Sequence, residues 1–300
     1  MRLEYLYYFK HLAETLNFTK AARDLFIAQP TLSAAIKRME KDLGFMLFKR
    51  EGNKVILSEA GKAFLEYVTI SLASYERGVS LAQEFQGVNS QEIKLGAIYA
   101  IQDKFFSKAL LEFSQQYSSV PHIMLDQGYS ETLVEELRNG SIDVAFASKL
   151  PDTDDLNFTL CWSQPIVVGV NTAHPLAKRK TVMLDELQSY KLLTYNDDSP
   201  VHPNVRALVN ANGLQAHYEC NNEVTMASLV SSNPENMALF CYSFLVNAFD
   251  GVVCLPIEGV PVDFHKIYLV SRKERHPKIV QEFLDFIGQY RFPSGFNESA

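Results

Sequence analysis

Residues 17–44, NFTKAARDLFIAQPTLSAAIKRMEKDLG, constrain the fold more than any other part of the chain. Apolar residues recur at helical spacing up to about Leu16, and a second, shorter pattern, KAARDLF, stops at IAQP. Pro30 fits the first turn of a third helix, where its missing N–H costs nothing, and Gly44 can end that helix. We therefore predict two helices, the second of them short, then a sharp turn and a longer third helix.

The predicted third helix has two contrasting faces. Its apolar stripe, from Leu32 to Leu43, should be core, whereas the opposite side is polar and basic. This is the helix-turn-helix arrangement, whose second helix enters the major groove of double-stranded DNA. A small helical bundle with a solvated charged face is the alternative. The DNA-binding residues that we expect here are Thr19, Gln29, Pro30, Thr31, Ser33, Ala34, Lys37 and Arg38.

Residues 45–57, FMLFKREGNKVIL, follow with two short apolar runs around KREGNK, in which Gly52-Asn53 suits a turn. We predict a basic-tipped hairpin, or wing, with Arg50 and Lys54 beside the phosphates of the duplex. Charge agrees with this interpretation: residues 1–58 carry ten Lys or Arg and six Asp or Glu, hence +4, whereas the whole chain carries −7. A basic head on an acidic body indicates a polyanion partner for the head alone.

A long helix should run from a cap at Ser58 to about Gln86. Its apolar residues alternate steps of four and three, the spacing of a seam that packs against a partner helix. We expect dimerisation through it, giving a homodimer or homotetramer and an operator with two-fold symmetry. The alternative is a helix that lies back on its own domain. The predicted dimerisation residues are Leu65, Val68, Leu72, Tyr75 and Val79.

After a polar linker at residues 86–91 the pattern changes to alternating strands and helices. EIKLGAIY, HIMLDQ and DVAFA, with helices between them, predict a parallel sheet covered by helices. A second series runs from PIVVGV to VVCLPI, and strand FHKIYLVS and helix 277–290 close the chain. The sequence therefore predicts an α+β multidomain protein with two α/β lobes and a ligand cleft between them.

Other chemistry has weak support in the sequence. The cysteines, Cys161, Cys220, Cys241 and Cys254, form no CxxC pair and are expected to be buried free thiols, with a redox pair of Cys241 and Cys254 as the alternative. The histidines show no metal-ligand spacing, and neither GxSxG nor a Walker loop is present. We expect no enzyme, no metal and no cofactor. No stretch approaches the roughly 20 apolar residues of a membrane span, so a cytoplasmic protein without a membrane partner is expected.

FTKAARDLFIAQPTLSAAIKRMEKDLGFMLFKR and LSEAGKAFL resemble the winged helix-turn-helix of LysR-type transcriptional regulators. GYSETLVEELRNGSIDVAFA and VVGVNTAHPLAKRKTVMLDEL resemble the lobes of that family's effector module more loosely. The resemblance implies a DNA-binding domain at 1–58, a dimerising linker helix and hinge at 59–91, and a periplasmic-binding-protein-like effector domain at 92–300. Lobe one would comprise about 92–163 plus 267–300, and lobe two about 164–266.

The resemblance also implies a small-molecule effector, held at the carboxyl ends of the strands. Relatives often carry Ser or Thr at the first lobe's helix N-terminus to hold a carboxylate, but this chain has Ala100, with Asp103 close by. We therefore expect a more apolar or cationic effector, or none. A small-molecule-binding protein or enzyme with a helical N-terminus that binds no DNA is the alternative function. The predicted effector residues are Ala100, Ile101, Gln102, Gln127, Ser148, Tyr195, Asn196, Asn222 and Thr225.

Overall fold

The computed structural model describes residues 2–52, 54–88, 90–101, 104–117 and 120–292. The chain forms two compact units, Met1–Ser90 with Glu136–Ser141, and Gln91–Glu135 with Ile142–Ala300. The predicted effector residue Gln102, its neighbour Asp103 and the predicted turn residue Asn53 lie outside the described residues.

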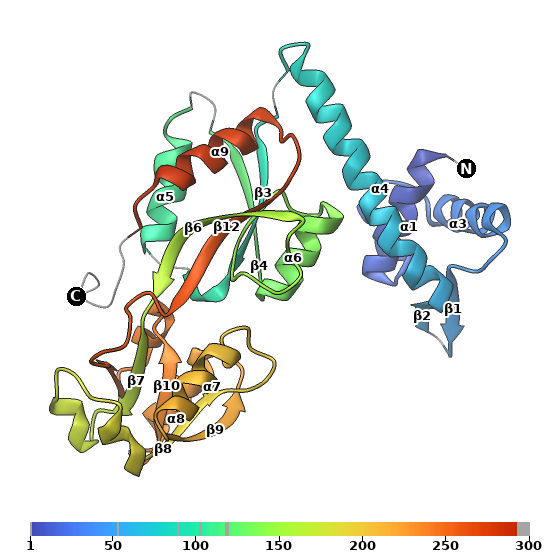
Figure 1. Cartoon of the computed structure of the whole chain (residues 1–300). Coiled ribbons are helices and arrows are strands. Elements are labelled where there is room, and N and C mark those ends of the chain that lie inside the picture. The colour runs from blue at the N-terminus through green and yellow to red at the C-terminus, as the bar shows by residue number, and fades with distance from the viewer. Residues whose placement is uncertain (1, 53, 89, 102–103, 118–119, 293–300) are drawn as a thin grey trace. The chain divides into compact units, whose positions relative to one another are not determined.

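The first unit begins with the predicted helices and hairpin (Figure 1). The second helix starts at Phe18, two residues before the predicted KAARDLF, because the Asn17 side chain accepts the Lys20 N–H at 3.0 Å and so caps it. The antiparallel strands pair Phe48 with Leu57, as a wing requires. The elements are α1 (Leu3–Thr15), α2 (Phe18–Asp24), α3 (Gln29–Leu43), β1 (Phe48–Glu51), β2 (Lys54–Leu57) and α4 (Glu59–Glu84).

The core of this unit includes residues from α4 that the sequence assigned to a dimer seam. Val68 and Leu72 are buried in one cluster with Phe9 and Leu12 of α1, and Leu65 packs against that cluster. The prediction that these three residues face a partner helix is therefore corrected. A repeat of three and four residues suits packing on α1 as well as packing on a second copy, and periodicity alone does not distinguish them.

The first sheet of the second unit has the strand order β4-β3-β5-β12-β6. β3 runs parallel to β4 and β5, as predicted, but β12 runs antiparallel to both β5 and β6. Phe113 of α5 meets Phe283 of α9 at 5.0 Å between ring centroids, so these helices pack together. The elements are β3 (Glu92–Ile98), η1 (Tyr99–Ile101), α5 (Lys104–Ser114), β4 (His122–Gly128), α6 (Ser130–Asn139), β5 (Val144–Ala147), β6 (Leu156–Gln164), β12 (His265–Arg272) and α9 (Lys278–Gln289).

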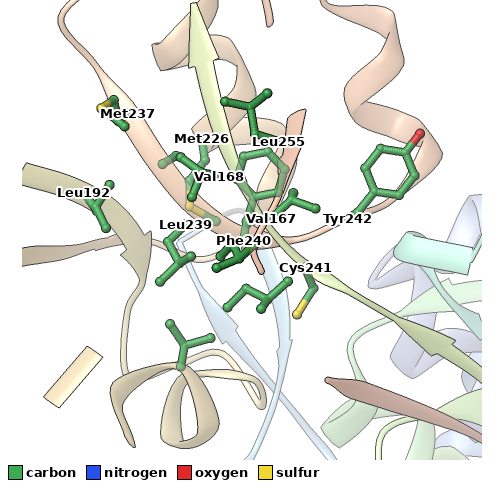
Figure 2. Packing of buried hydrophobic residues seen from close by; sticks show 14 of the residues in the cluster. Val167, Val168, Leu192, Met226, Met237, Leu239, Phe240, Cys241, Tyr242 and Leu255 are labelled. Atoms are coloured by element: carbon green, nitrogen blue, oxygen red, sulfur yellow. The ribbon is translucent and has the colours of Figure 1, made fainter. Parts of the chain in front are cut away.

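The second sheet has the order β11-β7-β10-β8-β9, with β7 antiparallel to β10 and β11. Figure 2 shows its core, in which Val167, Leu239 and Phe240 are fully buried. Gly169 is needed there because a β-carbon would lie 2.5 Å from the Phe240 ring. The elements are β7 (Ile166–Asn171), η2 (Pro175–Lys178), η3 (Asp185–Ser189), β8 (Lys191–Tyr195), α7 (His202–Ala211), β9 (Gln215–Cys220), α8 (Glu223–Ser232), β10 (Met237–Cys241), η4 (Phe244–Ala248) and β11 (Val252–Pro256).

Both sheets are thus mixed, whereas the sequence predicted a parallel sheet. The antiparallel strands arise because the chain passes between the sheets twice, from β6 to β7 through Pro165 and from β11 to β12. A strand that returns from the other sheet enters from the opposite end and so pairs in the opposite direction. Among the described helices, none combines the length and apolar character needed to cross a membrane.

Candidate DNA-binding face and ligand cavity

The N-terminal end of α3 presents an exposed row of small and polar side chains. Residues 25–28 turn the chain between α2 and α3, and the first residues of α3 lie at the surface. Ser33 is half-buried, and Thr19 on α2 is exposed. The exposed α3 residues among the predicted DNA contacts are Gln29, Pro30, Thr31, Ala34, Lys37 and Arg38.

The wing is tied to α3 by a buried carboxylate. Glu40, only 9 % exposed, accepts the backbone N–H of Leu47 at 2.8 Å and that of Phe48 at 3.2 Å. The strand that carries Arg50 therefore starts from a point fixed on the back of α3. Arg50 and Lys54 are both exposed on this hairpin, where basic side chains can contact phosphates.

The linker helix α4 presents a second apolar stripe, on a side away from the core of the head. Tyr67 is 67 % exposed and Ile70 is 36 % exposed. At 100° per residue these two residues and the exposed Ala63 and Ser74 fall within about 60° of one another. Of the predicted dimerisation residues, Tyr75 and Val79 are also exposed, at 50 % and 37 %.

The second unit contains a cavity of about 370 Å³ between its two sheets. Its lining comes from η1, from the ends of β4, β5 and β6, from the start of β12 and from the first turn of α8. The lining residues are Ile98, Tyr99, Ala100, Gly128, Tyr129, Ser130, Ser148, Gln164, Tyr195, Ser199, Pro200, Val201, Asn221, Asn222, Glu223, Val224, Thr225, Cys241, Leu245 and His265.

A chain of hydrogen bonds runs along one wall of this cavity. Ser148 Oγ and His265 Nε2 are 2.8 Å apart, and His265 Nδ1 lies 2.8 Å from Gln164 Oε1. Gln164 Nε2 donates to the carbonyl oxygen of Ala100 at 3.3 Å. Burial lowers the pKa of His265 to about 4, because desolvation penalises the imidazolium form. The imidazole is therefore neutral near pH 7.

The opposite wall combines a buried acid with a buried phenol. The Glu223 carboxyl accepts the Ser243 hydroxyl at 2.7 Å, and desolvation raises its pKa. The Tyr195 hydroxyl oxygen accepts the Cys241 N–H at 3.0 Å, and burial raises the pKa of Tyr195 well above its ordinary value. Asn222 caps α8 by accepting the Thr225 N–H at 2.8 Å. The described lining holds neither lysine nor arginine.

The structure brings several of the predicted effector residues together and separates others from the cavity. Ala100, Ser148, Tyr195, Asn222 and Thr225 line it. The other three described residues, Ile101, Gln127 and Asn196, are not part of the lining, and their placement is corrected.

Each of these three residues is held by other contacts. Ile101 is only 1 % exposed, because its side chain is buried in the hydrophobic core. Gln127 is exposed beside Tyr99, whose hydroxyl donates to the Gln127 carbonyl at 3.5 Å. Asn196 follows β8, and its N–H donates to the Cys220 carbonyl at 2.6 Å, which extends the pairing of β8 with β9 past the strand end.

Sequence analysis missed Gln164, Glu223 and His265. Gln164 and His265 are paired partners at the ends of β6 and β12, separated by 101 residues in the chain. Because the sequence analysis predicted no strand over residues 156–164, it could not predict that Gln164 pairs with His265. The Asn-Asn-Glu run at the start of α8 is a helix-capping signal that could have pointed to Glu223.

The four cysteines are all free thiols. Cys241 on β10 and Cys254 on β11 are separated by β7, which pairs with both strands, so the alternative of a Cys241–Cys254 pair is wrong for this fold. Burial raises the pKa of the Cys161 and Cys254 thiols to about 12. Within the part of the chain that the structure describes, no cluster of side chains suits a metal ion.

Known proteins resemble this chain along nearly its whole length. The family model described as bacterial regulatory helix-turn-helix protein, lysR family, matches residues 3–62, and the model described as LysR substrate binding domain matches residues 86–291. The HTH-type transcriptional activator CmpR of Synechocystis sp. is 30 % identical over 285 residues, which cover 93 % of this chain and 92 % of CmpR.

Solved structures agree on the fold. Full-length CbnR, crystallised with its target DNA, superposes with a TM-score of 0.73 at 20 % identity and covers 96 % of this chain and 99 % of its own. A full-length OxyR variant from Pseudomonas aeruginosa gives a TM-score of 0.67 at 21 % identity, covering 96 % of this chain and 95 % of its own. The winged head, linker helix and two-lobed module of this chain therefore form a known architecture.

Proposed function

The chain belongs to the LysR family of bacterial regulatory helix-turn-helix proteins, and on that premise we propose which of its residues bind DNA, which hold an effector and which form a dimer. It is a DNA-binding transcriptional regulator with an effector-binding domain. We assign DNA binding to residues 1–58, dimerisation to the linker at 59–91, and effector binding to 92–300. Lobe one comprises about 92–163 plus 267–300, and lobe two about 164–266.

The exposed end of α3 reads the major groove. Gln29 and Thr31 lie at the helix start, which is the part of a recognition helix that reaches base edges, and glutamine can pair bidentately with adenine. Lys37, Arg38, Arg50 and Lys54 contact phosphates. The observation that carries this proposal is the exposed α3 row beside a wing that Glu40 fixes to the same helix.

The dimer forms through the exposed stripe of α4 rather than through its buried one. Tyr67 and Ile70 lie at the centre of the proposed contact. Tyr75 and Val79 lie about 80–180° away around the helix, in line with the buried Val68 and Leu72, and offer a second exposed contact beyond the end of the head's core. Two copies related by a two-fold axis would place two heads on half-sites related by turns of about 10 bp, so the operator has two-fold symmetry.

The effector is a small molecule bound in the 370 Å³ cavity. This size lies within the range of about 300–1,000 Å³ that is usual for ligand sites. Ala100, Ser148, Tyr195, Asn222 and Thr225 contribute to it, together with Gln164, Glu223 and His265. We propose no catalytic activity and no metal cofactor, and a protein that binds chromosomal DNA would act in the cytoplasm.

An electrophoretic mobility shift assay tests this function. The probe is the DNA upstream of the protein's own gene, with unrelated DNA of equal length as the competitor. We expect specific retention that survives an excess of the competitor. If unlabelled upstream DNA and unrelated DNA displace the probe equally well, sequence-specific binding is contradicted. That result would favour a small-molecule-binding protein whose head serves packing only.

A further inference from the structure

The hydrogen-bond chain along the cavity wall has a fixed direction, because one of its ends cannot donate. The carbonyl oxygen of Ala100 is an acceptor only, so the group of Gln164 that faces it must be the amide nitrogen. The amide oxygen of Gln164 then faces His265 Nδ1, at 2.8 Å. An amide oxygen accepts, and therefore Nδ1 is the ring nitrogen that carries the proton.

Because His265 is neutral, its tautomer also determines which group donates in the hydrogen bond between His265 and Ser148. His265 is 8 % exposed, and its burial keeps the pKa of the ring far below 7, so only one ring nitrogen is protonated. Since that nitrogen is Nδ1, Nε2 offers a lone pair and the Ser148 hydroxyl must donate to it across 2.8 Å. The oxygen of Ser148 then has only its lone pairs left for other partners.

Ser148 is also held in place from its backbone. Its N–H donates to Ser130 Oγ at 3.0 Å, and both serines line the cavity. The chain from Ala100 to Ser148 joins η1, the end of β6, the start of β12 and the end of β5. Gln164 and His265 are thus positioning residues for the Ser148 oxygen.

The charged groups that line the cavity also disfavour a carboxylate ligand. Its described lining contains the Glu223 carboxyl but neither lysine nor arginine, and the His265 ring is neutral. A carboxylate brought into this cavity would lose its hydration without gaining a cationic partner from the lining, which is costly. Lys149 and Lys266 line an adjoining pocket that shares Ser148 and His265, not this cavity. The lone pairs of Ser148 would face it as a second acceptor.

We propose that Ser148 acts as a hydrogen-bond acceptor in the effector cavity and selects a ligand whose polar end is an N–H donor, an amine or carboxamide, over a carboxylate of the same shape. This inference rests on the proposed function, because it takes the cavity to be the effector site. The Ala100–Gln164–His265 chain sets this selectivity by fixing the direction of the Ser148 hydroxyl.

The direction can be read from the tautomer of His265. Full-length protein labelled with ¹⁵N-histidine is studied by long-range ¹H–¹⁵N NMR at pH 7, and the His265→Gln variant assigns the resonance. We expect a neutral ring protonated at Nδ1. A ring protonated at Nε2 would donate to Ser148 instead and would overturn the proposal.

Selectivity is measured with benzamide and benzoate, two probes of the same shape that differ in the donor. Isothermal titration calorimetry on the full-length protein should give at least about tenfold tighter binding of benzamide. Ser148→Ala should abolish most of that difference, whereas Ser189→Ala, an exposed serine outside the lining, should preserve it.

The two possible failures are distinguishable. Tighter binding of benzoate than of benzamide, with the preference lost in Ser148→Ala, would overturn the acceptor role while leaving the cavity as a ligand site. Failure of both probes to bind, or binding that Ser148→Ala leaves unchanged, would remove the cavity as the site. The proposed effector function would then fail, and this inference with it.

Discussion

Gly61 approaches Leu47 so closely that a β-carbon on Gly61 would lie 2.0 Å from the Leu47 carbonyl oxygen. Gly61 is in the first turn of α4, and Leu47 immediately precedes the wing. The neighbouring Ser58 hydroxyl donates to the Met46 carbonyl at 2.6 Å and accepts the Gly61 N–H at 2.8 Å. The start of the linker helix is therefore fixed against the base of the wing.

Gly61→Ala should destabilise the head, because the clash is with backbone and must be relieved by moving either α4 or the wing. We expect a loss of about 1–3 kcal/mol in the free energy of unfolding, as is usual for overpacking. Gly78→Ala is the matched control in the same helix, where nothing lies within 4 Å of the added carbon. That change should leave stability unchanged or raise it by up to about 1 kcal/mol. Urea unfolding monitored by circular dichroism measures both, and equal effects would contradict this account of Gly61.

Glu40→Ala should weaken the attachment of the wing to α3. It leaves the N–H groups of Leu47 and Phe48 without their acceptor, at a cost of about 1–3 kcal/mol in stability. Glu40→Gln keeps an oxygen that can accept both bonds and should retain most of the stability. Hydrogen exchange at the two amides is the direct measurement. Protection that is equal in the two variants would show that another group satisfies these amides.

Tyr67→Asp with Ile70→Asp should release monomers while the head stays folded, because both side chains are on the exposed stripe of α4. Val68→Asp should instead unfold the head, since it places a charge among Phe9 and Leu12. Sedimentation velocity with circular dichroism separates the outcomes. A double variant that still sediments as a dimer would remove this stripe from the interface.

The effector domain should lose stability as the pH falls below the ordinary histidine value of 6.5. His265 has a folded pKa of about 4, so between those values the unfolded chain binds the proton and the folded chain does not. Between these two pH values, His265 therefore makes the free energy of unfolding increase with pH, by up to about 1.4 kcal/mol per pH unit. His265→Gln should remove this contribution. Chemical unfolding from pH 4 to 7 measures the difference, and parallel profiles would contradict the buried neutral ring.

Local patterns were enough to predict the head. Pro30, Gly44 and the apolar stripe from Leu32 describe α3 because a helix depends on neighbours within one or two turns. The spacing of apolar residues could not show whether α4 packs on α1 or on a second copy of the chain. Val68 and Leu72 have the spacing of a seam whether the surface that they meet belongs to α1 or to a second copy, and that choice depends on tertiary packing.

Long-range pairing limited the prediction of the cavity. Ser148 and Tyr195 were found because they lie at the ends of strands that could be recognised locally, Ser148 directly after β5 and Tyr195 as the last residue of β8. Gln164 was not, since β6 alternates only weakly between buried and exposed residues and its partner β12 begins about 100 residues later. Ile101 was wrongly placed in the cavity lining because the backbone turns into η1 after β3 and buries that side chain.

The salt dependence of DNA binding tests the central claim, that α3 and the wing hold the duplex, most directly. The logarithm of the binding constant is measured against the logarithm of the salt concentration for the parent protein and for Gln29→Ala, Lys37→Ala, Arg50→Ala and Lys180→Ala. Lys37→Ala and Arg50→Ala should each flatten the slope by roughly one unit and weaken binding to all sequences alike. Gln29→Ala should keep the slope and lose about 1–3 kcal/mol on the preferred site only. Lys180→Ala, an exposed lysine of the effector domain, should behave like the parent. Slopes and specificities equal to those of the parent in all four variants would contradict the claim.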